Sequence, residues 1–122
     1  MNFTVNPKAS FVVEFPYAGM GIINAALASG IPVDVYYVGH ENFEAVKTSG
    51  QFKDPSQIRL AVKGKRIFSE NMRGISPKGY FIIVNNSDSE SKINLEVKEI
   101  IPGPLPSSIS GLTGFGTSAA SN

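Results

Sequence analysis

The sequence of 122 residues contains no cysteine and no tryptophan, and it has a single histidine, His40. Without cysteine there are no disulfides, no thiolate metal ligands and no thiol nucleophile, so stability must come from packing or from a partner. Eleven Lys and Arg against ten Asp and Glu leave a formal charge of +1. Nucleic-acid-binding proteins need a larger basic excess to neutralise phosphates, so we expect no nucleic acid partner.

The sequence also lacks the patterns that catalysis requires. Any Ser-His-Asp triad would depend on His40, and no G-x-S-x-G nucleophile elbow is present. The dipeptide His40-Glu41 lacks the second histidine of the zinc motif H-E-x-x-H. We therefore predict a protein that is not an enzyme, with no catalytic residues, no metal site and no cofactor, and we interpret His40 as a solvated loop residue.

Targeting and membrane segments are not apparent either. The start, MNFTVNPKAS, has no charged segment followed by the apolar run of a secretory signal, so we expect synthesis in the cytosol with the final location open. The uncharged stretch 15–33 approaches the length of a membrane helix, but prolines and glycines such as Pro16 and Pro32 interrupt it. No membrane span is expected.

Alternation of apolar and polar residues predicts β-strands along most of the chain. The clearest case is KINLEVK, residues 92–98, in which Ile93, Leu95 and Val97 should face a core. The continuous apolar run YFIIV, residues 80–84, suits the centre of a sheet. The polar residues between these two strands should join them as a hairpin.

Glycine and proline predict where other strands end. GIP at residues 30–32 should separate one strand from the next, and KGK at residues 63–65 should reverse the chain in a second hairpin. Residues 41–47 are the only stretch that suits a helix. Seven or eight short strands at this spacing predict an all-β fold, an antiparallel β-sandwich of jelly-roll type with an extended C-terminal tail.

The composition changes after Ile101. Residues 102–122 contain three prolines followed by Ser, Gly, Thr and Ala, without a charged side chain. We therefore divide the chain into a β-sandwich domain, residues 1–101, and a tail, residues 102–122, which is a candidate docking arm or a passive flexible terminus. An apolar side chain recurs every three or four residues in the tail, a spacing able to contact a partner. These candidate partner-binding residues are Leu105, Ile109, Leu112 and Phe115.

Two small polar clusters suggest sites, but each fits a simpler structural role. NSDSE at residues 86–90 has the oxygen-rich character of a calcium loop, yet Ser91 and Val97 occupy the positions that need Gly and Glu, so a polar turn is the better interpretation. KGKR at residues 63–66 is basic enough to contact phosphate, but such charges normally protect a sheet edge and aid solubility.

Three segments together carry a family resemblance: GIPVDVYYV at 30–38, ISPKGYFIIVNNS at 75–87 and KINLEVKEI at 92–100. Their spacing resembles that of bacterial pre-peptidase C-terminal domains and of Golgi-dynamics-type domains, over roughly residues 9–101. The resemblance implies a jelly-roll-like β-sandwich without catalytic activity that acts as an accessory or protein-binding module. The sequence departs from that family in showing no signal, no partner domain and no cysteine.

Two functions follow as hypotheses. The first is a non-enzymatic structural protein of a symmetric assembly, most concretely a phage or virus-like particle capsid decoration (cement) protein that binds itself or a capsid subunit. The alternative is an accessory module of pre-peptidase C-terminal type that binds a protein or carbohydrate on a sheet face or loop rim. Aromatic residues most often belong to the core, but they are the candidate contacts for that module. They are Tyr17, Tyr36, Tyr37 and Phe43.

Deletion of residues 102–122 is expected to leave the sandwich folded and to weaken its self-association by at least about tenfold, which corresponds to about 1.4 kcal/mol. The physical reason is the loss of four apolar side chains that contribute about 1.5–3 kcal/mol each when buried. Size-exclusion chromatography with light scattering measures the association of the full and truncated chains. Equal association of the two chains would make the tail a passive appendage.

Overall fold

The computed structural model describes residues 1–17, 19 and 21–101 of the chain. Within these residues the chain forms antiparallel strands, one α-helix and one short 3-10 helix, and no helix is long and apolar enough to cross a membrane. The all-β fold predicted from the alternating pattern is confirmed. The elements are β1 (Asn2–Val5), β2 (Ala9–Pro16), β3 (Ile22–Val38), α1 (His40–Ser49), η1 (Pro55–Gln57), β4 (Ile58–Arg73), β5 (Lys78–Asn85) and β6 (Ser91–Ile101).

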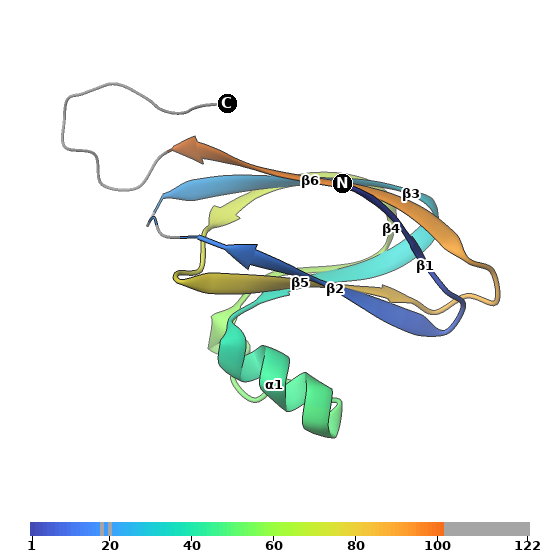
Figure 1. Cartoon of the computed structure of the whole chain (residues 1–122), viewed down its shortest axis with the longest axis horizontal. Coiled ribbons are helices and arrows are strands. Elements are labelled where there is room, and N and C mark those ends of the chain that lie inside the picture. The colour runs from blue at the N-terminus through green and yellow to red at the C-terminus, as the bar shows by residue number, and fades with distance from the viewer. Residues whose placement is uncertain (18, 20, 102–122) are drawn as a thin grey trace.

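The long strand β3 takes part in both layers of the sandwich (Figure 1). Residues 22–29 pair with β6, residues 34–38 pair with β5, and β4 pairs with β3 on its other side over nearly its whole length. β1 extends the first layer beyond β6, and β2 extends the second layer beyond β5. We call the two layers the β6 sheet (β1-β6-β3-β4) and the β5 sheet (β2-β5-β3-β4).

The core lies between the two sheets and is made by inward-facing residues of every strand. Ile93 and Leu95 are buried, and Val97 is partly buried against the same cluster, as the alternation in β6 predicts. The rings of Tyr37 and Phe81 stack at its centre with centroids 4.4 Å apart. Side chains of this kind stabilise a fold by about 1.5–3 kcal/mol each on full burial, so the core supplies most of the driving force for folding.

The predicted break at residues 30–32 is wrong, because β3 continues through it. The register places four residues of β3, 29–32, opposite the single residue Arg66 of β4. Such an irregular position leaves some residues without a ladder partner, which is where a strand tolerates a proline such as Pro32. The chain therefore bends from one sheet into the other without ending the strand.

The predicted hairpin at residues 63–65 is also wrong, because β4 continues from Ile58 to Arg73. Gly64 does have the left-handed backbone of a turn residue, with φ 65°. Here, however, Lys63 and Gly64 together lie opposite Asp34 of β3, between the pairs Val35–Val62 and Val33–Lys65. Glycine takes this conformation in bulges as readily as in turns. The described residues thus form six strands, two of them long, in place of seven or eight short ones.

The expected hairpin between residues 80–84 and 92–98 is likewise not formed. β5 lies between β3 and β2 in one sheet, while β6 lies between β3 and β1 in the other. The central position predicted for residues 80–84 is correct, because β5 has a strand on each side. Its outer face is also buried, because α1 covers it. Phe43 of α1 stacks on Tyr80 with ring centroids 4.1 Å apart. The single helix is confirmed, and it ends at Ser49, where Gly50 caps it with a left-handed φ of 77°.

Gly79→Ala is expected to destabilise the domain by about 1–3 kcal/mol, the usual cost of overpacking a core. A methyl group at Gly79 would lie far inside van der Waals distance of the buried Tyr37 ring. Gly30→Ala is the matched control, because it is also a strand glycine and a methyl group there meets nothing within 4 Å. Urea denaturation of both variants measures the difference. Equal stability of the two variants would contradict the packing of β5 on Tyr37.

Candidate functional site

The aromatic residues proposed as ligand contacts belong to packed clusters. Tyr17 and Tyr37 are buried in the main core, and Tyr36 and Phe43 pack in the cluster between α1 and the β5 sheet. Tyr36 and Phe43 are partly exposed, and each ring already contacts another aromatic ring, Phe52 and Tyr80 respectively, so the four side chains do not gather in one open platform. The tail residues Leu105, Ile109, Leu112 and Phe115 lie outside the described residues.

The two buried tyrosine hydroxyls serve the fold. The Tyr17 hydroxyl accepts a hydrogen bond from the amide of Gly21 (2.9 Å), and the Tyr37 hydroxyl accepts one from the amide of Ile75 (2.9 Å). Burial is the main cause that raises the pKa of both tyrosines above the usual 10.0. Both hydroxyls therefore stay protonated at neutral pH, so neither is an activated nucleophile.

His40 is exposed, but it lies in the first turn of α1 and not in a loop. Its Nδ1 lies 3.2 Å from the hydroxyl of Tyr80, and its ring tilts against the Tyr80 ring at 5.9 Å. The partner of the His40 imidazole is thus the phenol of Tyr80, whereas a Ser-His-Asp triad has a carboxylate at this position. In the part of the chain that the structure describes, no three His, Asp or Glu side chains gather to hold a metal ion.

The polar segment after β5 is a hydrogen-bonded turn organised by Asn85. The buried Asn85 amide donates to the carbonyls of Val5 (3.1 Å) and Ser89 (2.8 Å), and its Oδ1 accepts from the amide of Ser87 (3.0 Å). The side chain thereby ties the turn to the end of β1. The interpretation of residues 86–90 as a polar turn agrees with these contacts.

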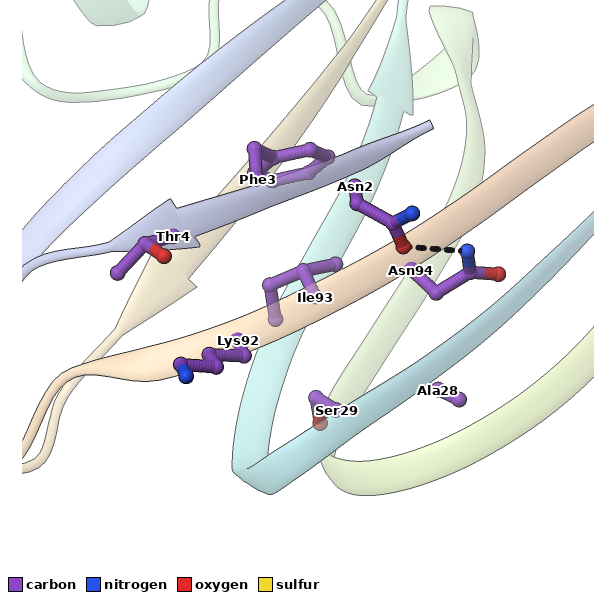
Figure 2. Close-up of a pocket in the computed structure, with 8 residues that line it drawn as sticks. All are labelled: Asn2, Phe3, Thr4, Ala28, Ser29, Lys92, Ile93 and Asn94. Atoms are coloured by element: carbon purple, nitrogen blue, oxygen red, sulfur yellow. Dashed lines mark hydrogen bonds between the residues drawn. The ribbon is translucent and has the colours of Figure 1, made fainter.

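A shallow depression opens on the outer face of the β6 sheet, with a volume of about 520 Å³. Figure 2 shows its lining residues, which come from the short edge strand β1, the facing part of β6 and the bend of β3. The register that pairs β1 with β6 brings the far ends of the described chain together here. The lining residues are Asn2, Phe3, Thr4, Ala28, Ser29, Lys92, Ile93 and Asn94.

An amide pair crosses the depression. Nδ2 of Asn94 donates to Oδ1 of Asn2 at 2.6 Å, as the dashed line in Figure 2 shows. Each Asn amide has one acceptor oxygen and two donor hydrogens. Among the described residues the Asn94 oxygen and the Asn2 nitrogen make no side-chain hydrogen bond, so an acceptor on Asn94 and donors on Asn2 remain available on either side of the pair.

The neighbouring side chains keep this amide pair accessible. Ala28 of β3 lies opposite Asn94 in the register and is exposed, so a small side chain forms the adjacent floor. The Ser29 hydroxyl is directed into the fold, since it donates to the carbonyl of Ile31 at 2.6 Å. Lys92 supplies the only charge of the lining. The lining contains no His, Asp, Glu or Cys, so its polar groups are amides, hydroxyls and the Lys92 ammonium, which can bind polar partners.

The sequence pattern alone does not find this depression. Asn2 and Asn94 are 92 residues apart in the chain, and only the β1–β6 register brings them together. The alternation in KINLEVK predicts one part of the depression, because it places Asn94 on the outer face of its strand.

The architecture places the chain among antiparallel β-sandwich domains. It is similar in fold to the pre-peptidase C-terminal domain of a collagenase from Bacillus anthracis, a crystal structure that matches with a TM-score of 0.52. The match covers 80% of this chain and 88% of that chain, at 14% sequence identity. No family model matches the sequence, and no curated protein matches it significantly. The fold expected from the resemblance to pre-peptidase C-terminal domains is thereby supported.

Proposed function

We propose that this chain is a non-catalytic accessory module that holds a protein partner in the depression of the β6 sheet. The observation that carries the proposal is the amide pair of Asn2 and Asn94, whose free donor and free acceptor flank their mutual hydrogen bond on the open face of the sheet, as Figure 2 shows. A backbone peptide group offers the complementary acceptor and donor. The partner is therefore an extended stretch of polypeptide that lies across the depression.

The lining favours a polypeptide over a carbohydrate. Aromatic rings contribute most to contacts at binding surfaces when a ring face is open. The one aromatic residue of the lining is Phe3, and one face of its ring is already stacked on Phe11 with centroids 4.4 Å apart. Sugar stacking therefore has less support in this depression than hydrogen bonding to a peptide group.

The accessory module has better support than the capsid decoration hypothesis. The Bacillus anthracis domain of similar fold is described as a pre-peptidase C-terminal domain of a collagenase, which agrees with the second hypothesis derived from the sequence. None of the comparisons supports a virion, a capsid or a homo-oligomer. Collagen, the substrate that the name of that enzyme implies, is thus a reasonable first probe for this chain.

Ala28→Trp is expected to weaken binding to insoluble collagen at least tenfold, because an indole at the floor of the depression blocks access to the amide pair. Ala61→Trp is the matched control, since Ala61 is also an exposed strand alanine but pairs with Tyr36 in the other sheet. Co-sedimentation with collagen measures binding, and thermal unfolding verifies that both variants fold. The control should bind within about twofold of the unchanged chain.

Chitin and cellulose provide the carbohydrate arms of the same experiment. Binding to collagen that Ala28→Trp alone abolishes supports the proposal. Binding to chitin or cellulose in place of collagen would show that the depression binds a carbohydrate, which contradicts the proposal. Equal loss in both variants, or no binding to any of the three polymers, would contradict it as well.

A further inference from the structure

The basic residues of this chain are concentrated on one strand, β4, although the net charge of the whole chain is close to zero. Strand β4 holds all three arginines, Arg59, Arg66 and Arg73, together with Lys63 and Lys65. It holds one acidic residue, whereas the chain has eleven basic and ten acidic residues in all. The rest of the chain therefore has six basic and nine acidic residues. A strongly basic strand is embedded in a weakly acidic domain.

The five cationic side chains of β4 are exposed and unpaired. All five residues are open to solvent. The ion pairs found in the described part of the chain lie elsewhere, and no residue of β4 takes part in them. The residues outside the described part contribute no charged side chain. The cationic groups of β4 therefore make no direct ion pair with the carboxylates of the described residues.

The fold arranges these side chains along one continuous edge. β4 pairs only with β3, so its other edge is free in both sheets among the described residues. Its sixteen residues follow β3 around the bend from one sheet into the other, over a contour length of roughly 50 Å at the usual strand rise. Near the bend, the carboxylate of Asp34 accepts from the amide of Gly64 (2.8 Å) and from the side chain of Asn86 (2.9 Å), so one negative charge lies against the backbone between Lys63 and Lys65.

We propose that the free edge of β4 binds a linear anionic polysaccharide, either sulfated or carboxylated. A guanidinium group presents a planar fork of donors that matches sulfate and carboxylate. The three arginines therefore indicate recognition of these groups, because positive charge alone could be supplied by lysine. Cations that recur along the whole length of a strand match a polymer with repeated charges better than a compact ion. This surface is separate from the depression, and the inference does not depend on the proposed protein partner.

Edge protection and nucleic acid binding fit the composition of β4 less well. Lysines on an edge strand prevent edge-to-edge aggregation, but that role does not require arginine or the scarcity of carboxylates on β4. Single-stranded nucleic acids are bound by cationic grooves with aromatic rings on which bases stack. The one aromatic residue of β4, Phe68, is partly buried against the core, so the strand offers no such ring.

The test compares two triple variants of equal net charge. One carries Arg59→Gln, Arg66→Gln and Arg73→Gln on β4, and the control carries Lys47→Gln, Lys53→Gln and Lys98→Gln at sites away from β4. Binding to heparin and to alginate is measured by titration calorimetry at several salt concentrations. The β4 variant should bind at least tenfold more weakly than the unchanged chain, and the control should bind within about twofold of it.

The outcomes separate the sources of the anion. Binding to heparin identifies sulfate and binding to alginate identifies carboxylate, and either supports the proposal if only the β4 variant loses it. Equal losses in both variants, no binding to either polymer, or tighter binding to a short DNA would overturn it. The double variant Lys63→Gln, Lys65→Gln replaces the triple variant if that chain fails to fold. Collagen binding should persist in every β4 variant, which keeps this test independent of the depression.

Discussion

The structure depends on a single constraint, the passage of β3 through both sheets. Its first half is paired with β6 and its second half with β5, and both halves contribute fully buried residues such as Ile23 and Val35 to the same core. The bend between them is fixed by the hydroxyl of Ser29, which donates to the carbonyls of Ile31 (2.6 Å) and Arg66 (3.3 Å). Because one strand supplies the centre of each layer, the two sheets cannot separate without breaking that strand's own pairing.

The same constraint shapes the two proposed binding surfaces. The bend of β3 places Ala28 and Ser29 beside β6, which separates them from the short strand β1, and the three strands together line the open depression on the β6 sheet. It also leaves β4 as the outermost strand of both layers, so that strand presents one long free edge within the described chain. The buried faces are needed for stability, since the chain has no disulfide to replace them. The two proposed binding surfaces accordingly lie on an outer sheet face and on an outer strand edge.

The parts of the fold that the sequence predicts are those determined by local pattern. KINLEVK alternates because one face of β6 is wet and the other faces the core. The apparent break at residues 30–32 misleads because its role depends on the pairing with β4, which no local pattern reports. Gly64 misleads because left-handed glycine occurs in turns and bulges alike. The amide pair of Asn2 and Asn94 could not be predicted, since it requires the register of two strands at opposite ends of the domain.

Native-state amide hydrogen exchange tests the central role of β3 most directly. If one strand holds both sheets together, the amides of Ala25 and Leu27 on one side of the bend and of Val35 and Tyr37 on the other should exchange only through global unfolding. Their opening free energies should then be equal to one another and to the free energy of unfolding from urea denaturation. A markedly lower opening free energy on one side of the bend would show that the two sheets open independently, which contradicts the central role of β3.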